Sequence, residues 1–153
     1  MTREDIRLTW AQLPAYVRDG IERVLSETVV LADSQPGGFS PGTADRVLLA
    51  SGRRAFIKAA SADTNQFTAT LHRDEAAVTA GLPAGVPAPP LLGSYDDGTW
   101  VALVLGDVEG RHPALPWCAD DVASALESLH AMVGIPVPEE LLLPRATPWC
   151  TAT

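Results

Sequence analysis

The stretch GGFSPGTADRVLLASGRRAFIK, residues 37–58, decides the fold that the sequence predicts. A turn rich in glycine and proline opens it, two apolar runs follow, and the second run ends on Lys58. The runs 46–50 and 54–60 have the length and composition of β-strands, and residues 51–52 between them are typical of a hairpin turn. We therefore expect two antiparallel strands that follow a glycine-rich loop and place a lysine near the end of the second.

The glycine-rich turn has the composition of a phosphate-binding loop. Backbone N–H groups approach an anion closely where no Cβ intervenes, and Gly37, Gly38 and Gly42 allow that approach. Ser40 adds a hydroxyl donor, and Phe39 is placed to cap the tip of the loop against solvent. An ordinary hairpin loop has the same composition, so it is the lysine downstream that favours phosphate binding.

Lys58 is the only lysine in the chain and stands at the end of an apolar strand. Alternation along a strand turns Phe56 to the same side as Lys58 and Ile57 to the opposite side. A lysine on the cleft side of a sheet needs a negative partner, which a nucleotide phosphate supplies. The alternative is a surface lysine whose stem covers apolar surface while its amine stays in water.

The sequence on either side of this stretch predicts further helices and strands. Apolar periodicity predicts helices at 13–25, at about 64–81 and at 120–133. Apolar and β-branched runs predict strands at 28–31, 91–95 and 100–105. On the second helix, Leu71, Glu75, Val78 and Leu82 share one face. The order predicts an α+β fold: a five-stranded antiparallel sheet with one packed helix, preceded by an N-terminal helix and followed by a hinge and one helix.

The composition excludes several classes of protein. With 153 residues, 46% of them hydrophobic, the chain has the size and composition of one globular domain. No window approaches the roughly 18 consecutive apolar residues of a membrane span, and the charged N-terminus lacks a signal-peptide core, so we expect a cytoplasmic protein. The cysteines Cys118 and Cys150 lack metal-ligand spacing, so we expect neither a metal site nor a disulfide.

The charge of the chain is −8 and unevenly distributed. The net charge repels nucleic acid and anionic membranes, so we expect neither as a partner. Between residues 36 and 60, however, Arg46, Arg53, Arg54 and Lys58 stand against Asp45 alone. This cationic region coincides with the glycine-rich turn, which favours an anionic ligand there. The three arginines are equally well explained as solvated strand and turn residues.

Several segments, in order, together carry a family resemblance. They are QPGGFSPGTADRV, RRAFIKA, the glutamate of HRDEA, PAPPLLGSYDDGTWVAL, DVEGRHP and the Pro-Trp pair at 116–117. These segments resemble bacterial members of the aminoglycoside phosphotransferase-like family, small-molecule kinases with a protein-kinase fold, over nearly all of residues 10–133. The resemblance implies a kinase-like nucleotide-binding N-terminal lobe at 1–105, a hinge and linker at 106–118, and a remnant of the C-terminal lobe at 119–153.

The resemblance implies ATP as the ligand and assigns residues to its phosphate end. The glycine-rich turn would cover the phosphates, and Lys58 would reach the α and β phosphates. Glu75, in the middle of the predicted helix, would fix the position of the lysine's ammonium group. Asp74 is the competing candidate, but the family has glutamate followed by alanine, which matches Glu75 and Ala76.

The resemblance also assigns residues to the adenine end of the ligand. The segment after the last strand would lie flat against the base, and the backbone of Gly106 and Val108 would hydrogen-bond adenine. The apolar walls of the slot would come from Val47, Ala55 and Leu103 or their neighbours. A simple turn at this place in the sequence is the alternative.

The family's catalytic residues have no counterpart in the sequence. The family places its catalytic aspartate, and the asparagine and aspartate that hold magnesium, in an H-x-D-x-x-x-x-N loop and a later acidic motif. Of the histidines, His72, His112 and His130, only His72 precedes an aspartate by two residues, and that aspartate lies in the predicted helix. We therefore expect no kinase activity from this chain alone, with magnesium bound only in a complete enzyme.

Three hypotheses remain open from the sequence. The chain is the lobe of an ATP-dependent phosphotransferase, truncated or completed by a separate polypeptide; or it is a nucleotide-binding regulatory module without turnover; or it is a protein-interaction module that has kept the fold. The helix at 120–133 aligns Val122, Leu126, Leu129 and Val133 on one face. Self-association or a missing C-terminal lobe would cover that face.

Overall fold

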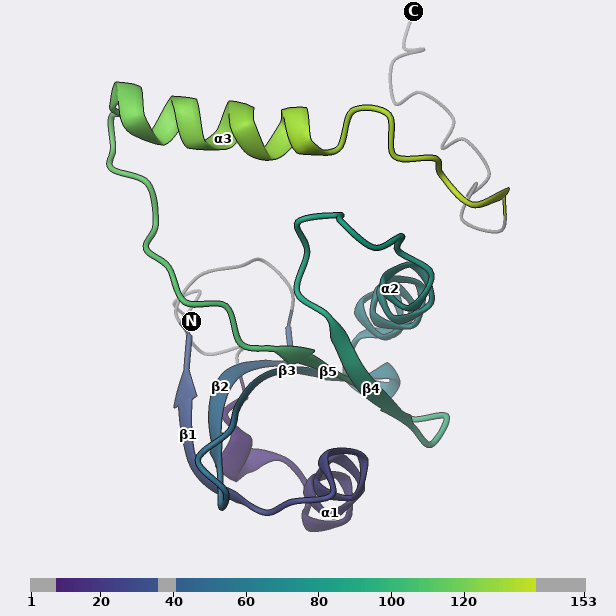
Figure 1. Cartoon of the computed structure of the whole chain (residues 1–153). Coiled ribbons are helices and arrows are strands. Elements are labelled where there is room, and N and C mark those ends of the chain that lie inside the picture. Colours follow the sequence, from purple (N-terminus) through teal and green to yellow (C-terminus); the bar gives the residue numbers. More distant parts are fainter. Residues whose placement is uncertain (1–7, 36–40, 140–153) are drawn as a thin grey trace, which may run out of the picture. The chain divides into compact units, whose positions relative to one another are not determined.

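The computed structural model describes residues 8–35 and 41–139. Its elements are, in order, η2 (Trp10–Gln12), α1 (Ala15–Leu25), β1 (Val29–Ser34), β2 (Thr43–Leu49), β3 (Arg54–Ser61), α2 (Ala62–Ala80), β4 (Leu91–Asp96), β5 (Trp100–Gly106) and α3 (Ala119–Ala131) (Figure 1). Within the described residues, none of the helices has the length and apolar character needed to cross a membrane. The helices and strands follow the order that the sequence predicts.

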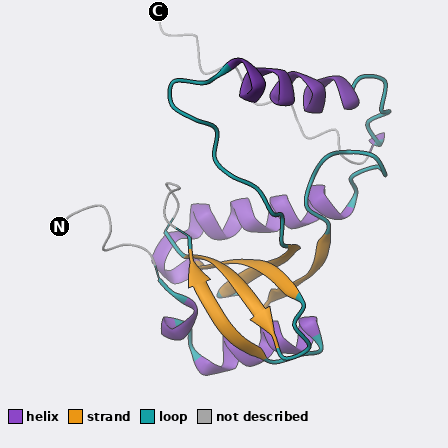
Figure 2. Ribbon diagram, turned by 60° about the vertical axis from the view of Figure 1, so that its left-hand side comes forward, coloured by secondary structure: helices purple, strands orange, loops and turns teal. Residues whose placement is uncertain are grey.

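The five strands form one open antiparallel sheet in the order β1-β2-β3-β5-β4. The fold is therefore α+β, as predicted. Helix α1 covers one face of the sheet and α2 the other (Figures 1 and 2). Residues 50–53 connect β2 to β3 around the expected turn, and Gly52 adopts a positive φ of 87° there. Strand β3, which carries Lys58, lies at the centre of the sheet and pairs with a strand on each side.

Each face of the sheet has its own apolar core, because side chains alternate along the strands. The face toward α1 holds the larger core, in which α1 residues pack on Val47, Leu49, Ala55, Ile57, Ala59, Trp100, Ala102 and Val104. The face toward α2 holds a smaller core of Ala69, Val101, Leu103 and Leu105, with Phe56, Ala62, Ala76 and Leu91 against it. Lys58 shares the α2 face, since its neighbours in register are Ala44 and Leu103.

The face of α2 that packs on the sheet differs from the predicted one. Its buried residues are Thr68, Ala69 and His72, whereas Leu71 is exposed. The packing of the helix against the sheet therefore decides which of its faces is buried, rather than the position of its largest apolar side chains. The regular part of the helix begins after Asn65, whose backbone is not helical and whose side-chain oxygen accepts the Thr68 N–H at 2.9 Å.

The chain divides into two compact units, one of residues 1–80 and 89–110 and one of residues 81–88 and 111–153. The first unit contains the sheet, α1 and α2. In the second unit, the Asp121 carboxylate accepts bonds from the Ala114 N–H at 2.9 Å, Arg111 Nη2 at 2.6 Å and Cys118 Sγ at 3.2 Å. These donors lower the pKa of Asp121 to about 2. They hold the start of α3, whose apolar residues Val122, Leu126 and Leu129 are exposed, as is Val133 just after the helix.

Candidate functional site

Lys58 and Glu75 form an ion pair that joins β3 to α2. The distance from Lys58 Nζ to Glu75 Oε2 is 2.5 Å, and both side chains are about one third exposed, at 29% and 36%. Glu75 rather than Asp74 is thus the partner, as expected. Arg73 anchors the same turn of α2, because its Nε and Nη2 contact the Asp96 carboxylate at 2.8 and 3.0 Å. The ammonium group of Lys58 is therefore held in a fixed position and remains within reach of solvent.

His72 forms the third member of this cluster. Its Nδ1 lies 3.8 Å from Glu75 Oε2, one helical turn away on the same face of α2. The residue is buried, and Nδ1 has no hydrogen-bond partner in the described residues. Burial lowers the pKa of His72 below its ordinary value of 6.5, and the charge of Lys58 lowers it further against the opposing effect of Glu75. The sequence analysis did not predict that His72 lies beside Glu75, although their i,i+3 spacing on one helix indicates it.

The stability of the protein is expected to rise with pH around 6.5 because of His72. Below that pH the histidine of the unfolded chain binds a proton while the buried one stays neutral, so acidification favours the unfolded state. Urea unfolding measured between about pH 5 and 8 should show this slope, and His72→Gln should flatten it. As a control, His130→Gln removes an exposed histidine of α3 and should keep it. Equal slopes in wild type and His72→Gln would contradict the assignment.

Most of the glycine-rich turn lies outside the described residues. The part that lies outside them includes the predicted ligand contacts Gly37, Gly38, Phe39 and Ser40. Gly42 is described, has a φ of 130° and leads into β2. A Cβ on Gly42 would lie 2.3 Å from the backbone oxygen of Ala59 on β3. Close contact between the two strands therefore explains this glycine without a ligand.

The apolar residues predicted as walls of the adenine slot do not all lie on the Lys58 face. Val47 and Ala55 are paired in register and belong to the core toward α1, so they face away from Lys58. Residues at odd separation from Lys58 point to the opposite face, so Ala55 does not form the predicted wall, whereas Val47 also lines the hollow described below. Leu103 does lie on the Lys58 face, where it is buried. Phe56 lies on the same face as Lys58, as alternation along the strand predicts, and packs against the smaller core.

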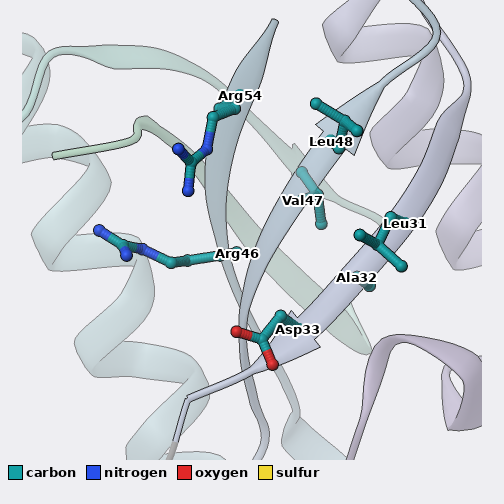
Figure 3. A pocket seen from close by; sticks show the side chains of 7 residues that line it. All are labelled: Leu31, Ala32, Asp33, Arg46, Val47, Leu48 and Arg54. Atoms are coloured by element: carbon teal, nitrogen blue, oxygen red, sulfur yellow. The ribbon is translucent and has the colours of Figure 1, made fainter. Parts of the chain in front are cut away.

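A hollow of about 570 Å³ lies over the first three strands. Its lining residues are Leu31, Ala32, Asp33, Arg46, Val47, Leu48 and Arg54 (Figure 3). The register pairs Leu31 with Leu48, and it pairs Asp33 with Arg46. Alternation places these four side chains and that of Arg54 on the Lys58 face. Figure 3 shows the guanidinium groups of Arg46 and Arg54 reaching to the same side of the strands.

The segment that follows β5 forms ionic contacts with two arginines that line this hollow. The Asp107 carboxylate is only 4% exposed and lies 2.9 Å from Arg46 Nε and 3.2 Å from Arg54 Nε. These contacts are ionic rather than well-aligned hydrogen bonds. Arg46 Nη2 also donates to the carbonyl of Val108, and Arg54 Nη1 contacts Glu109 Oε1 at 3.1 Å. Both arginines are thus engaged, rather than merely solvated as the alternative interpretation held.

The predicted hinge residues lie beside the hollow, and some of their backbone groups have protein partners. The Gly106 N–H donates to the Pro90 carbonyl at 2.8 Å, and the Val108 carbonyl accepts from Arg46. These two groups are not available to a base in this arrangement. In the described residues the N–H of Val108 has no such partner. The structure therefore brings Val108 close to the hollow while leaving one of its two backbone groups as a donor.

No protein-family model and no curated protein matches the chain. The aminoglycoside phosphotransferase-like family therefore stays a prediction from the resembling segments. The geometry of the Lys58 face is the basis for a proposal about function. That face combines a fixed ammonium group, apolar side chains that line a hollow, and a segment held by two arginines of the same hollow.

Proposed function

We propose that the chain binds a nucleoside triphosphate, ATP by its family resemblance, on the α2 face of its sheet. The observation that carries the proposal is the ion pair between Lys58 and Glu75. Glu75 fixes the ammonium group, and positioned cations are the main device by which proteins hold the phosphates of nucleotides. A plain helix-to-sheet ion pair is the alternative, but a partly exposed cationic group on the same face of the sheet as a hollow favours an anionic ligand.

The base would occupy the hollow over β1, β2 and β3. Leu31 and Leu48 supply apolar surface, and 570 Å³ falls within the range of small-molecule sites. Val108 lies at the edge, where its N–H can donate to the base. Lys58 and Arg54 are four residues apart on β3, a distance of about 13 Å at the usual rise per residue. An extended nucleotide spans such a distance, with its phosphates toward Lys58.

The proposal covers nucleotide binding by a lobe of the phosphotransferase type. Bound ATP would supply a phosphoryl group for transfer, and Lys58 would hold the phosphates in place. In the part of the chain that the structure describes, no group of three or more His, Cys, Asp or Glu side chains is arranged to hold a metal ion. No step of the proposal uses a metal ion.

Lys58→Met is expected to weaken ATP binding by about 10- to 100-fold, the effect of losing charge-assisted hydrogen bonds worth about 1.5–3 kcal/mol. Isothermal titration calorimetry with ATP measures the affinity of wild type and variant directly. Arg53→Met is the matched control: it removes one cation from the same hairpin, and its partner Glu27 lies at 2.7 Å, away from the hollow. Equal affinities of wild type and Lys58→Met, or no binding by wild type, would overturn the proposal.

A further inference from the structure

We propose that Arg46 and Arg54 are positioning residues that fix residues 107–109, here called the linker segment, at the edge of the hollow. In this position the linker segment presents the Val108 N–H to the base, and the two arginines thereby set the affinity for the base half of the nucleotide. The inference rests on the proposed function, and it concerns residues that neither the glycine-rich turn nor the Lys58 pair includes.

The first argument is the burial of Asp107. A carboxylate that is only 4% exposed is costly unless cations neutralise it, and two guanidinium groups do so from adjacent strands. Arg46 comes from β2 and Arg54 from β3. The main chain at Asp107 is therefore tied to the sheet at two points. Removal of either arginine leaves a buried carboxylate with one partner and loosens the segment.

The second argument is the shape of the Arg46 contacts. Arg46 uses Nε for Asp107 and Nη2 for the carbonyl of Val108, so one planar group fixes a side chain and the next peptide unit. With its carbonyl bound to Arg46, Val108 keeps its N–H as the group to offer a ligand. A lysine would keep the charge at this position but not the planar fork that contacts both groups.

The third argument separates positioning from fold stability. The Arg54 side chain is half exposed, and its second partner Glu109 is 84% exposed. Exposed ion pairs of this kind contribute about 1 kcal/mol or less to folding. The contact of Arg54 with Glu109 therefore adds little to stability, and its clearest consequence is a further point of attachment for the backbone beside the hollow.

The test compares two probes, ATP and inorganic tripolyphosphate, by calorimetry. Arg46→Gln is expected to weaken ATP binding by about 10-fold, the loss of the hydrogen bond that the positioned Val108 N–H gives to the base, and to change tripolyphosphate binding less than about 2-fold. Arg46→Lys is expected to bind ATP as weakly as Arg46→Gln, because a lysine does not restore both contacts. Arg53→Gln removes the same charge from the neighbouring hairpin turn and should leave both affinities unchanged.

Each outcome separates this inference from the proposed function. If ATP binding by wild type does not depend on Lys58, the proposed function fails and the inference with it. If it does depend on Lys58 but Arg46→Gln binds ATP like wild type, or loses tripolyphosphate to the same extent, the positioning role alone is wrong. Should Arg46→Gln fail to fold, Arg54→Gln carries the same comparison, since it leaves the contact of Arg46 with Asp107 in place.

Discussion

Ile57→Ala is expected to lower the free energy of unfolding by about 2–5 kcal/mol, because it deletes buried methyl and methylene groups and leaves a cavity. Ile57 is fully buried on the central strand β3, in the core toward α1. Its register partners are Asp45 on β2 and Val104 on β5, so strands hold it on both sides. Domains of this size are stable by about 5–15 kcal/mol, so the loss is a large share of the total. Urea unfolding followed by circular dichroism measures it.

Leu31→Ala is the matched control for this prediction. Leu31 is 63% exposed on the opposite face of the sheet, so the same kind of truncation should change the free energy of unfolding by about 0.5 kcal/mol or less. The comparison tests whether Ile57 lies in the core toward α1 and Leu31 lies outside both cores. If Leu31→Ala destabilises the protein as much as Ile57→Ala, the assignment of the two faces is wrong.

The sequence predicted the elements well because the signals for them are local. Turn residues at 51–52 and 96–98 separate apolar runs, and both hairpins lie where these residues place them. The bounds of β1 and β2 were less predictable. Strand β1 continues to Ser34, beyond the predicted end at Leu31, because its last residues pair with β2 at 45–47. Such pairing depends on the neighbouring strand, which local propensity does not contain.

For the candidate site too, local sequence patterns predicted some contacts and not others. The partner of Lys58 was predicted correctly because a helix after the strand brings Glu75 back over it. Ala55 was placed wrongly, although counting by twos from Lys58 along β3 gives Phe56. The contact of Arg46 with Val108 joins residues 62 positions apart, and no spacing rule indicates it. Such contacts depend on the whole fold.

Gly42→Ala is expected to lower the free energy of unfolding by about 3–5 kcal/mol, the sum of backbone strain and overpacking. The φ of Gly42 is 130°, a conformation that residues with a Cβ rarely adopt. The added Cβ would also lie 2.3 Å from the backbone oxygen of Ala59. A backbone atom of a paired strand cannot move aside as a flexible side chain can, so β2 and β3 would have to separate.

Gly52→Ala provides the matched control, because Gly52 also has a positive φ, of 87°, yet nothing lies within 4 Å of its added Cβ. This variant should cost about 1–2 kcal/mol, the strain of the left-handed backbone alone. The difference between the two variants in urea unfolding isolates the contact with Ala59. If instead Gly42→Ala is as stable as Gly52→Ala but binds ATP less tightly, Gly42 serves the ligand and not the strand pair. That result would return Gly42 to the role that the glycine-rich turn first indicated.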